Sequence, residues 1–251
     1  MDATERVLYM LVDFDNISPL GRTKGVDHIL HGTVDATAGV LGNAMPRRVT
    51  VRLYGGWYDG VKMTRKAQEL VRSKYFASPV PRCPTGFASS DRVFLKAELA
   101  RTLLSRAGDR DVSPLPCTCR TRSVSAAGFR TRFPPHTRCN AQPCFVTDLG
   151  TFFRTGQCPQ SHSHPDIADC VVRDEQKLVD VMLAADLLHL ARGGSGVTVV
   201  LVSSDDDLWP AILQATPEIG TLVHIHTQEG GERERYEKFV DRGHYAKTKF
   251  M

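Results

Sequence analysis

The sequence predicts an α/β fold, with three layers of helix, sheet and helix around a central, mainly parallel sheet. The first observation is the aliphatic run Val197–Val202, which suits a strand buried on both faces. The second is a similar run at Leu8–Val12. The third is the alternation of such runs with segments of helical periodicity, which is typical of a parallel sheet covered on both sides. The chain of 251 residues is long enough for one such core carrying an insertion.

The first half of the chain contains two predicted strands and three predicted helices. The strands are expected at Arg6–Asp15 and Arg48–Tyr58, where apolar residues are continuous or alternate with polar ones. Helical spacing of apolar residues predicts a helix at Val26–Leu41. We also expect a short basic helix at Thr64–Phe76 and an amphipathic helix at Ser90–Arg106.

The second half returns to the same alternation. A short strand is expected at Asp169–Arg173, and the most regular helical pattern of the chain covers Glu175–Ala191. The strand at Val197–Val202 then leads into a helix from about Asp207 to Ala215 and a last strand at Thr221–Thr227. For Phe145–Thr155 the sequence is compatible with either a pair of strands or an irregular segment that leads back to the α/β pattern.

A segment rich in cysteine, arginine and proline interrupts the α/β pattern at residues 108–168. Its low hydrophobicity argues against an independent apolar core unless a metal ion orders it. The α/β domain is therefore expected to be discontinuous, formed by residues 1–107 and 169–251.

Charge is unevenly distributed, although the net charge is only +4. No Asp or Glu occurs between Val112 and Thr147, a window with five arginines: Arg120, Arg122, Arg130, Arg132 and Arg138. Such a basic segment would suit a polyanion bound next to metal ions. The alternative is a solvated loop without a ligand, and the sequence leaves both interpretations open.

The expected compartment bears on the state of the seven cysteines. The chain has no apolar run of the ~20 residues that span a bilayer, and its first residues lack the pattern of a signal peptide. We therefore expect a cytoplasmic protein with no membrane partner, in which disulfides are disfavoured. Structural Zn²⁺ is one interpretation of the seven cysteines and ordinary thiols the other. The candidate zinc ligands are Cys117, Cys119, Cys139 and Cys144, or else Cys158, His162, His164 and Cys170.

Carboxylates follow two of the predicted strands. Asp13 and Asp15 come after the first, and Ser203-Ser204-Asp205-Asp206-Asp207 follows Val197–Val202. The second cluster could simply begin a helix with Ser204 as its N-cap. Parallel strands end at one edge of a sheet, however, and neighbours lie about 4.8 Å apart. Carboxylates meeting there could bind Mg²⁺ or Mn²⁺, which prefer oxygen ligands.

The predicted helix at Glu175–Ala191 adds two further acids. Asp180 and Asp186 lie about 120° apart around the helix and about 9 Å apart along it, so one ion cannot bind both directly. Asp180, near the helix start, is the better ligand candidate, whereas Asp186 would support the site indirectly or carry a surface charge. Lys177 could form an ordinary i, i+3 ion pair with Asp180.

Three motifs in this order resemble those of NYN domains, a PIN-like group related to FLAP nucleases. They are Asp13-Phe14-Asp15-Asn16, Lys177-Leu178-Val179-Asp180 and Ser203-Ser204-Asp205-Asp206-Asp207-Leu208. The resemblance implies metal-ligating roles for Asp13, Asp180, Asp205 and Asp207, and a positioning role for Asn16. The chain departs from the family pattern at Leu178 and Ser204, where glycine is usual, and at Leu208, where an aromatic residue is usual. The resemblance does not extend to the insertion.

The resemblance implies metal-dependent hydrolysis of phosphodiester bonds, with RNA preferred over DNA as the partner. The expected Mg²⁺ or Mn²⁺ ligands are Asp13, Asp15, Asp180, Asp205 and Asp207. The expected substrate-binding residues are Asn16, Lys177, Arg120, Arg122, Arg130 and Arg132. Two alternatives remain: a nucleic-acid-binding scaffold with a vestigial metal site, and a phosphatase-like enzyme acting on a small molecule. Association into a homo-oligomer also stays open.

Overall fold

The computed structural model describes residues 7–106, 119–123, 145–158, 171–176, 178–194, 196–227, 234–240 and 243–250. The chain divides into two compact units. The first is formed by Met1–Cys119 and Gln176–Met251, and the second by Arg120–Glu175. The α/β part of the chain is therefore assembled from two distant stretches of sequence.

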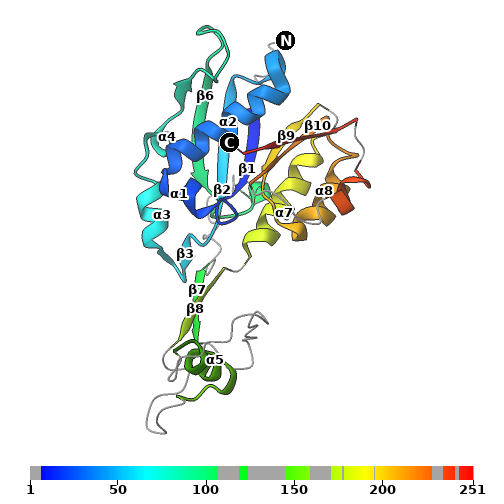
Figure 1. Ribbon diagram of the computed structural model, residues 1–251. Coiled ribbons are helices and arrows are strands. Elements are labelled where there is room, and N and C mark those ends of the chain that lie inside the picture. Colours follow the sequence, from blue (N-terminus) through cyan, green and yellow to red (C-terminus); the bar gives the residue numbers. More distant parts are fainter. Residues whose placement is uncertain are drawn as a thin grey trace. The chain divides into compact units, whose positions relative to one another are not determined.

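A seven-stranded sheet lies at the centre of the first unit (Figure 1). Its strand order is β11-β10-β9-β1-β2-β6-β5, and all neighbours are parallel except β5 and β6. The strands are β1 (Val7–Asp13), β2 (Arg48–Tyr54), β5 (Val80–Arg82), β6 (Val93–Leu99), β9 (Thr198–Val202), β10 (Thr221–His226) and β11 (Tyr245–Lys249). The two strands that precede the acidic motifs, β1 and β9, are direct neighbours.

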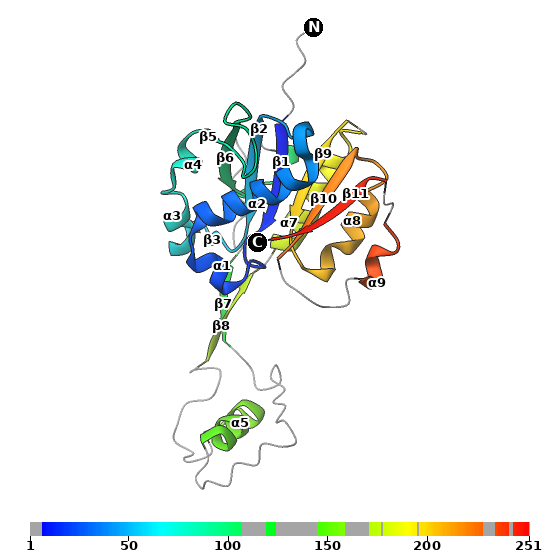
Figure 2. The same cartoon turned by 45° about the horizontal axis from the view of Figure 1, so that its top comes forward.

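Helices cover both faces of this sheet, which gives the three-layer α/β/α arrangement expected from the sequence. One face packs against α2 (Val26–Leu41), which lies in front of β1 and β2 in Figure 2. The short helices α1 (Pro19–Thr23), α3 (Arg65–Leu70) and α4 (Lys74–Ala77) accompany it. The other face packs against α7 (Val179–Ala191) and α8 (Trp209–Ala215).

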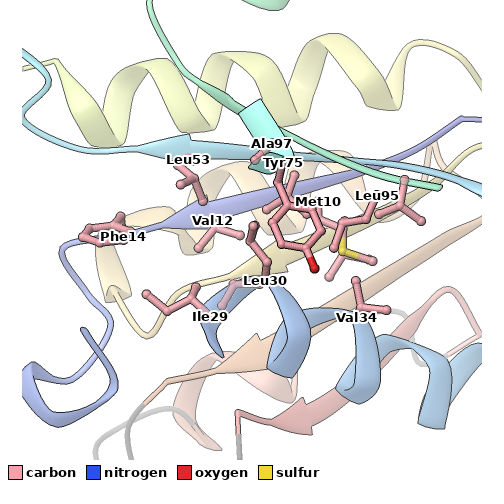
Figure 3. Packing of buried hydrophobic residues seen from close by; sticks show 14 of the residues in the cluster. Met10, Val12, Phe14, Ile29, Leu30, Val34, Leu53, Tyr75, Leu95 and Ala97 are labelled. Carbon is pink, nitrogen blue, oxygen red and sulfur yellow. The ribbon is translucent and has the colours of Figure 1, made fainter. Parts of the chain in front are cut away.

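Alternation along the buried strands divides the core into two clusters. In β1, Met10 and Val12 pack with Leu30 of α2, as Figure 3 shows. Leu11 points to the opposite face, where it packs with Leu183 of α7. This alternation explains why the strands are apolar on both faces, as expected for a covered parallel sheet. It also assigns Asp13, two residues after Leu11, to the face covered by α7.

Smaller elements complete the first unit. A two-stranded hairpin is formed by β3 (Tyr58–Asp59) and β4 (Lys62–Met63), and α9 (Glu234–Glu237) precedes β11. The 3₁₀ turns are η1 (Gly42–Ala44), η2 (Leu104–Arg106) and η4 (Asp206–Leu208). In the described part of the chain, no helix is both long and apolar enough to cross a membrane.

The second unit, described by itself, contains a ribbon and a helix. The ribbon pairs β7 (Cys119–Ser123) with β8 (Val172–Gln176), and the helix is α5 (Phe145–Thr155). The helix falls on the segment for which the sequence left a strand pair or an irregular return open. The short strand predicted at Asp169–Arg173 is displaced toward the C-terminus, so α7 begins at Val179 rather than Glu175.

The prediction of an amphipathic helix at Ser90–Arg106 is wrong, because this segment contains strand β6. Val93, Leu95, Ala97 and Leu99 alternate with Phe94, Lys96 and Glu98, and burial follows the same period of two. The apolar spacing matched a helix only in part, whereas the full pattern matches a strand with one covered face. The parallel pairing of this segment with β2 favours the strand over the helix.

Two further differences concern shorter elements. The basic helix predicted at Thr64–Phe76 is divided into α3 and α4 by a turn. The charged tail after Glu229 contains the edge strand β11, for which the sequence gives no apolar run. An edge strand has one pairing partner and tolerates polar residues, so its sequence signal is weak.

Candidate metal centre

Three carboxylates from distant parts of the chain meet at the C-terminal edge of the sheet. Asp13 is the last residue of β1, Asp205 follows β9, and Asp180 lies in the first turn of α7. One oxygen of each lies within 4.8 Å of the others. We refer to these three residues as the metal-centre cluster. The expectation that the two acidic strand ends converge is thus fulfilled for Asp13 and Asp205.

Ser203 connects the two strand ends. Its buried hydroxyl donates a hydrogen bond to Asp13 Oδ2 at 2.9 Å and accepts one from the backbone N–H of Asp205 at 3.0 Å. The backbone carbonyl of Ser203 lies 3.1 Å from His224 Nε2 on β10. Ser203 therefore fixes the relative positions of two cluster residues. The Ser203 side chain was not among the predicted site residues, although its place directly after β9 was a usable signal.

Asn16 connects the loop after β1 to the loop after β9. Its side-chain oxygen accepts hydrogen bonds from Ser204 N at 2.9 Å and from Thr227 Oγ1 at 2.8 Å. Its backbone N–H donates to Asp13 Oδ1 at 3.2 Å. These contacts agree with the expected role of Asn16 in positioning the first loop. Thr227, which immediately follows β10, is a positioning residue that the sequence did not suggest.

The third motif forms a turn in which Asp205, rather than Ser204, is the capping residue. Asp205 Oδ1 accepts a hydrogen bond from the backbone N–H of Asp207 at 2.9 Å and so begins η4. The Ser204 hydroxyl instead accepts a hydrogen bond from Thr227 N at 2.9 Å. The two interpretations of this segment are therefore compatible, since Asp205 caps a helical turn and also belongs to the cluster.

Asp180 reaches the cluster from a strained helix start. Leu178, the N-cap residue of α7, has a φ of 67°, and it is the only non-glycine residue with positive φ among those described. Left-handed backbone costs a leucine about 1–2 kcal/mol relative to ordinary conformations. Asp180 itself is exposed, so its carboxylate can adjust toward a ligand.

Burial and repulsion between carboxylates disfavour the charged forms of Asp13 and Asp180. Asp13 is 4% exposed, and burial together with the charges of Asp180 and Asp15 raises its pKa to about 6, against the hydrogen bonds from Ser203 and Asn16. Partial burial and the charges of Asp205, Asp207 and Asp15 raise the pKa of Asp180. Among the described residues, no lysine or arginine forms an ion pair with Asp13, Asp180 or Asp205. A bound cation could therefore supply the counter-charge that these carboxylates lack.

The donor set suits a hard divalent cation. Three carboxylates supply only oxygen ligands, the kind that Mg²⁺ and Mn²⁺ prefer. Oxygens on opposite sides of a Mg²⁺ ion lie about 4.2 Å apart. The cluster oxygens lie within 4.8 Å of one another, so an ion bound by all three would draw them closer together, and Asp180 is the exposed member of the three.

Two predicted ligands lie outside the metal-centre cluster. Asp15 forms ion pairs with Lys66 and Arg22 and accepts a hydrogen bond from Gly56 N at 3.3 Å. Asp207 is exposed and donates its backbone N–H to Asp205, and its charge acts on Asp180 from outside the cluster. The structure thus brings together three of the five predicted ligands.

Asp186 is fully buried near the middle of α7, which rules out the surface position considered for it. Its Oδ2 accepts hydrogen bonds from Tyr54 Oη at 2.6 Å and from Arg52 Nε at 3.1 Å. Its Oδ1 accepts one from the backbone N–H of Leu104 at 2.7 Å. Arg52 also contacts Glu98 Oε1 at 2.5 Å. Asp186 therefore attaches α7 to β2 and to the segment after β6.

Several predicted functional residues cannot be placed. Lys177, Arg130, Arg132, Cys117, Cys139 and Cys144 lie outside the described residues, as do Arg138, His162, His164 and Cys170. Arg120 and Arg122 belong to strand β7, and their side chains are not described. Cys119 begins β7 and is half-buried. The zinc and arginine predictions therefore stay predictions.

Comparison with known proteins gives no assignment: no family model, curated protein or solved structure matches this chain. Function is therefore inferred from the geometry of the metal-centre cluster and from the three motifs. Those motifs supply all three cluster residues, one from each.

Proposed function

We propose that this chain is a divalent-metal-dependent nuclease that hydrolyses phosphodiester bonds, with RNA as its preferred substrate. One observation carries the proposal: Asp13, Asp180 and Asp205 converge within 4.8 Å at the C-terminal edge of a parallel sheet. Ligand sites of open α/β sheets form at this edge. The proposed domain is PIN-like and of the NYN type, formed by residues 1–107 and 169–251.

The cluster residues would bind Mg²⁺ or Mn²⁺, and the positioning residues would keep them in place. A bound cation would supply an activated water and stabilise negative charge on the leaving oxygen. Ser203 and Asn16 donate hydrogen bonds to both oxygens of Asp13, which favours its ionised, metal-binding form. The Asp205 carboxylate is held in place in a similar way, because it accepts a hydrogen bond from the Asp207 N–H.

The conformation of Leu178 supports the resemblance to NYN domains. The position that follows the motif lysine is usually glycine in that family, and glycine adopts positive φ without strain. Here leucine occupies the position and nevertheless adopts a φ of 67°. Glycine at this position would adopt the same φ without strain, so the departure from the usual family residue is compatible with this helix start, and retained strain is typical of functional sites.

A cleavage assay tests the proposal. Labelled single- and double-stranded RNA and DNA are incubated with the protein in Mg²⁺, Mn²⁺ or EDTA. We expect cleavage of RNA with either metal and none with EDTA. Asp13→Asn should lower the rate by roughly 100-fold or more, because loss of even an outer partner of a metal ligand costs 10–100-fold.

Asp206→Asn is the matched control. It removes the same charge from an exposed residue of the third motif that lies outside the metal-centre cluster, so its rate should equal that of the wild type. RNA binding without cleavage would replace the nuclease with the non-catalytic scaffold. Hydrolysis of mononucleotides but not of oligomers would favour a small-molecule phosphatase instead.

A further inference from the structure

Two basic side chains surround Asp15, beside the metal-centre cluster. Lys66 Nζ contacts Asp15 Oδ1. Arg22 Nη1 donates a hydrogen bond to the Asp15 backbone carbonyl at 2.8 Å and lies 3.6 Å from Oδ1. We refer to Arg22 and Lys66 as the cation pair. One carboxylate neutralises one cation, so the group as a whole carries a surplus positive charge.

Both cations retain donors that can bind an anion. An ammonium group has three N–H donors and a guanidinium has five. Within the described part of the chain, Asp15 is the hydrogen-bond acceptor that each of these side chains reaches. Lys66 is 39% exposed and Arg22 is 32% exposed, whereas Asp15 is 17% exposed. The carboxylate is therefore covered by the cations, and the cations face solvent.

The position of Lys66 is fixed by aromatic rings as well as by charge. Its Nζ lies 4.7 Å from the ring centre of Phe14 and 5.4 Å from that of Trp57. These rings pack edge to face, and Trp57 Nε1 donates a hydrogen bond to Leu53 O at 2.8 Å. A Cβ atom at Gly55 would lie 2.8 Å from both Asp15 and Trp57, so only glycine fits there. Lys66 is thus preorganised, unlike an ordinary surface lysine.

The cation pair lies close to the metal-centre cluster. Asp15 follows Asp13 by two residues, and the charge of Asp15 is close enough to act on both Asp13 and Asp180. An acidic cluster that binds a metal and a neighbouring basic pair would together accommodate consecutive phosphates of a nucleic-acid strand.

We propose that Arg22 and Lys66 bind a backbone phosphate of the nucleic acid next to the phosphate at the metal centre. The position of that strand rests on the proposed function. Asp15, predicted as a metal ligand, then acts as the anchor that positions both cations. The simpler interpretation is that the cation pair only neutralises Asp15. The two interpretations differ in whether counterions are released when nucleic acid binds.

Salt dependence of RNA binding tests the proposal. The dissociation constant of a fluorescent oligouridylate is measured by anisotropy from about 50 to about 200 mM KCl, in EDTA, so that neither cleavage nor divalent ions affect it. Each phosphate contact to a single strand contributes about 0.7 to the slope of log K against log salt. Lys66→Gln and Arg22→Gln should each lower that slope by about 0.7, and their affinity deficit should shrink about threefold over this range.

Two variants serve as matched controls. Arg65→Gln removes the same charge from the neighbouring residue of α3, which is 93% exposed and paired with Glu69. Lys24→Gln removes one positive charge from an exposed residue next to α1. Both should retain the wild-type slope, as should Lys66→Arg. The Arg22→Gln result stands by itself if Lys66→Gln does not fold.

If Lys66→Gln and Arg22→Gln have the same slope as the wild type and the control variants, the proposal is overturned. The cation pair then only neutralises Asp15. Failure of the wild type to bind at about 50 mM KCl would also overturn it. Because binding is measured in EDTA, the outcome is independent of cleavage. A protein that binds through the cation pair but never cuts RNA contradicts the proposed nuclease alone, and one that cuts RNA with an unchanged slope contradicts this inference alone.

Discussion

Asp13 is the most buried carboxylate of the metal-centre cluster. It is buried, it accepts hydrogen bonds from Ser203 and Asn16, and it lies next to two further carboxylates. Burial and repulsion oppose its ionisation, whereas a bound cation would favour it. The apo protein therefore tolerates an unfavourable charge that a metal would stabilise.

This leads to a prediction for the apo protein. Burial raises the pKa of Asp13 in the folded state from the usual 3.8 to about 6, so the folded protein binds more protons than the unfolded chain between these pH values. The free energy of unfolding should therefore fall as pH rises from about 4 to about 6, by up to roughly 3 kcal/mol. Guanidinium denaturation in EDTA at a series of pH values measures this change.

Asp13→Asn isolates the contribution of that residue. The difference in unfolding free energy between the variant and the wild type should increase with pH over the same window and be constant above it. A difference that does not change with pH would show that Asp13 ionises normally. Excess Mn²⁺ should reverse the trend for the wild type, because a cation binds the ionised carboxylate.

At this scale the sequence predicted the meeting of Asp13, Asp180 and Asp205 but not the roles of Asp15 and Asp207. Parallel strands end at one edge, so the last residues of β1 and β9 are necessarily close. Beyond the strand end, the direction of a side chain depends on the loop. The partner of Asp15, Lys66, lies 51 residues away in sequence, so no local pattern reveals it.

At the scale of single elements, α7 shows how the site is positioned from a distance. Its N-terminal turn carries Asp180, and Asp186 attaches the same helix to β2 through Arg52 and Tyr54. Burial and the negative charge of Asp186 raise the pKa of Tyr54 well above its usual value, so its hydroxyl remains a donor. The helix was predictable from its apolar period, whereas its anchor on β2 was not, because Asp186 and Arg52 are distant in sequence.

Replacing each of the two aspartates of α7 with asparagine should have different effects on the free energy of unfolding. Asp186→Asn leaves the buried Arg52 guanidinium without its full counter-charge and should lower the free energy of unfolding by about 3–5 kcal/mol. Asp180→Asn should leave apo stability unchanged or raise it, because Asp180 is exposed and repelled by Asp205 and Asp207. Chemical denaturation in EDTA measures both.

Manganese binding distinguishes the roles of these residues further. Asp180→Asn should abolish Mn²⁺ binding in isothermal titration, and Asp186→Asn should retain it at temperatures where the variant is folded. Loss of Mn²⁺ binding in folded Asp186→Asn would place Asp186 in the site itself, contrary to its burial 2.6 Å from Tyr54 Oη.

Element prediction failed where two periods competed. In β6, Val93, Leu95 and Leu99 satisfy part of a helical pattern, but Ala97 and the polar residues between them complete a strand pattern. Pairing with β2 supplies the decisive free energy, and that contact is long-range. The edge strand β11 was missed because Tyr245–Lys249 is mostly polar.

At the scale of the whole molecule, the described α/β core is built from residues of the first unit. Both core clusters consist of residues from β1 to Ala100 and from α7 onward, among the residues described. The chain leaves the first unit at Cys119 and returns at Gln176, and these residues belong to the paired strands β7 and β8. The sequence predicts a discontinuous α/β domain because the apolar periodicity stops near residue 108 and resumes near residue 169, whereas no such pattern predicts the structure of the segment between them.

Replacing Arg120–Glu175 with a short Gly/Ser linker should therefore leave the first unit folded. Its thermal midpoint should stay close to that of the intact chain, and Mn²⁺ binding should persist, because all three cluster residues are retained. RNA affinity should fall, since the removed unit contains Arg120, Arg122, Arg130, Arg132 and Arg138. Glutamine at these five positions in the intact chain is the matched control and should reproduce the loss of affinity. If the excised protein binds RNA as tightly as the intact chain, with the same salt dependence, the basic insertion has no part in binding, and the cation pair and the metal-centre cluster account for it alone.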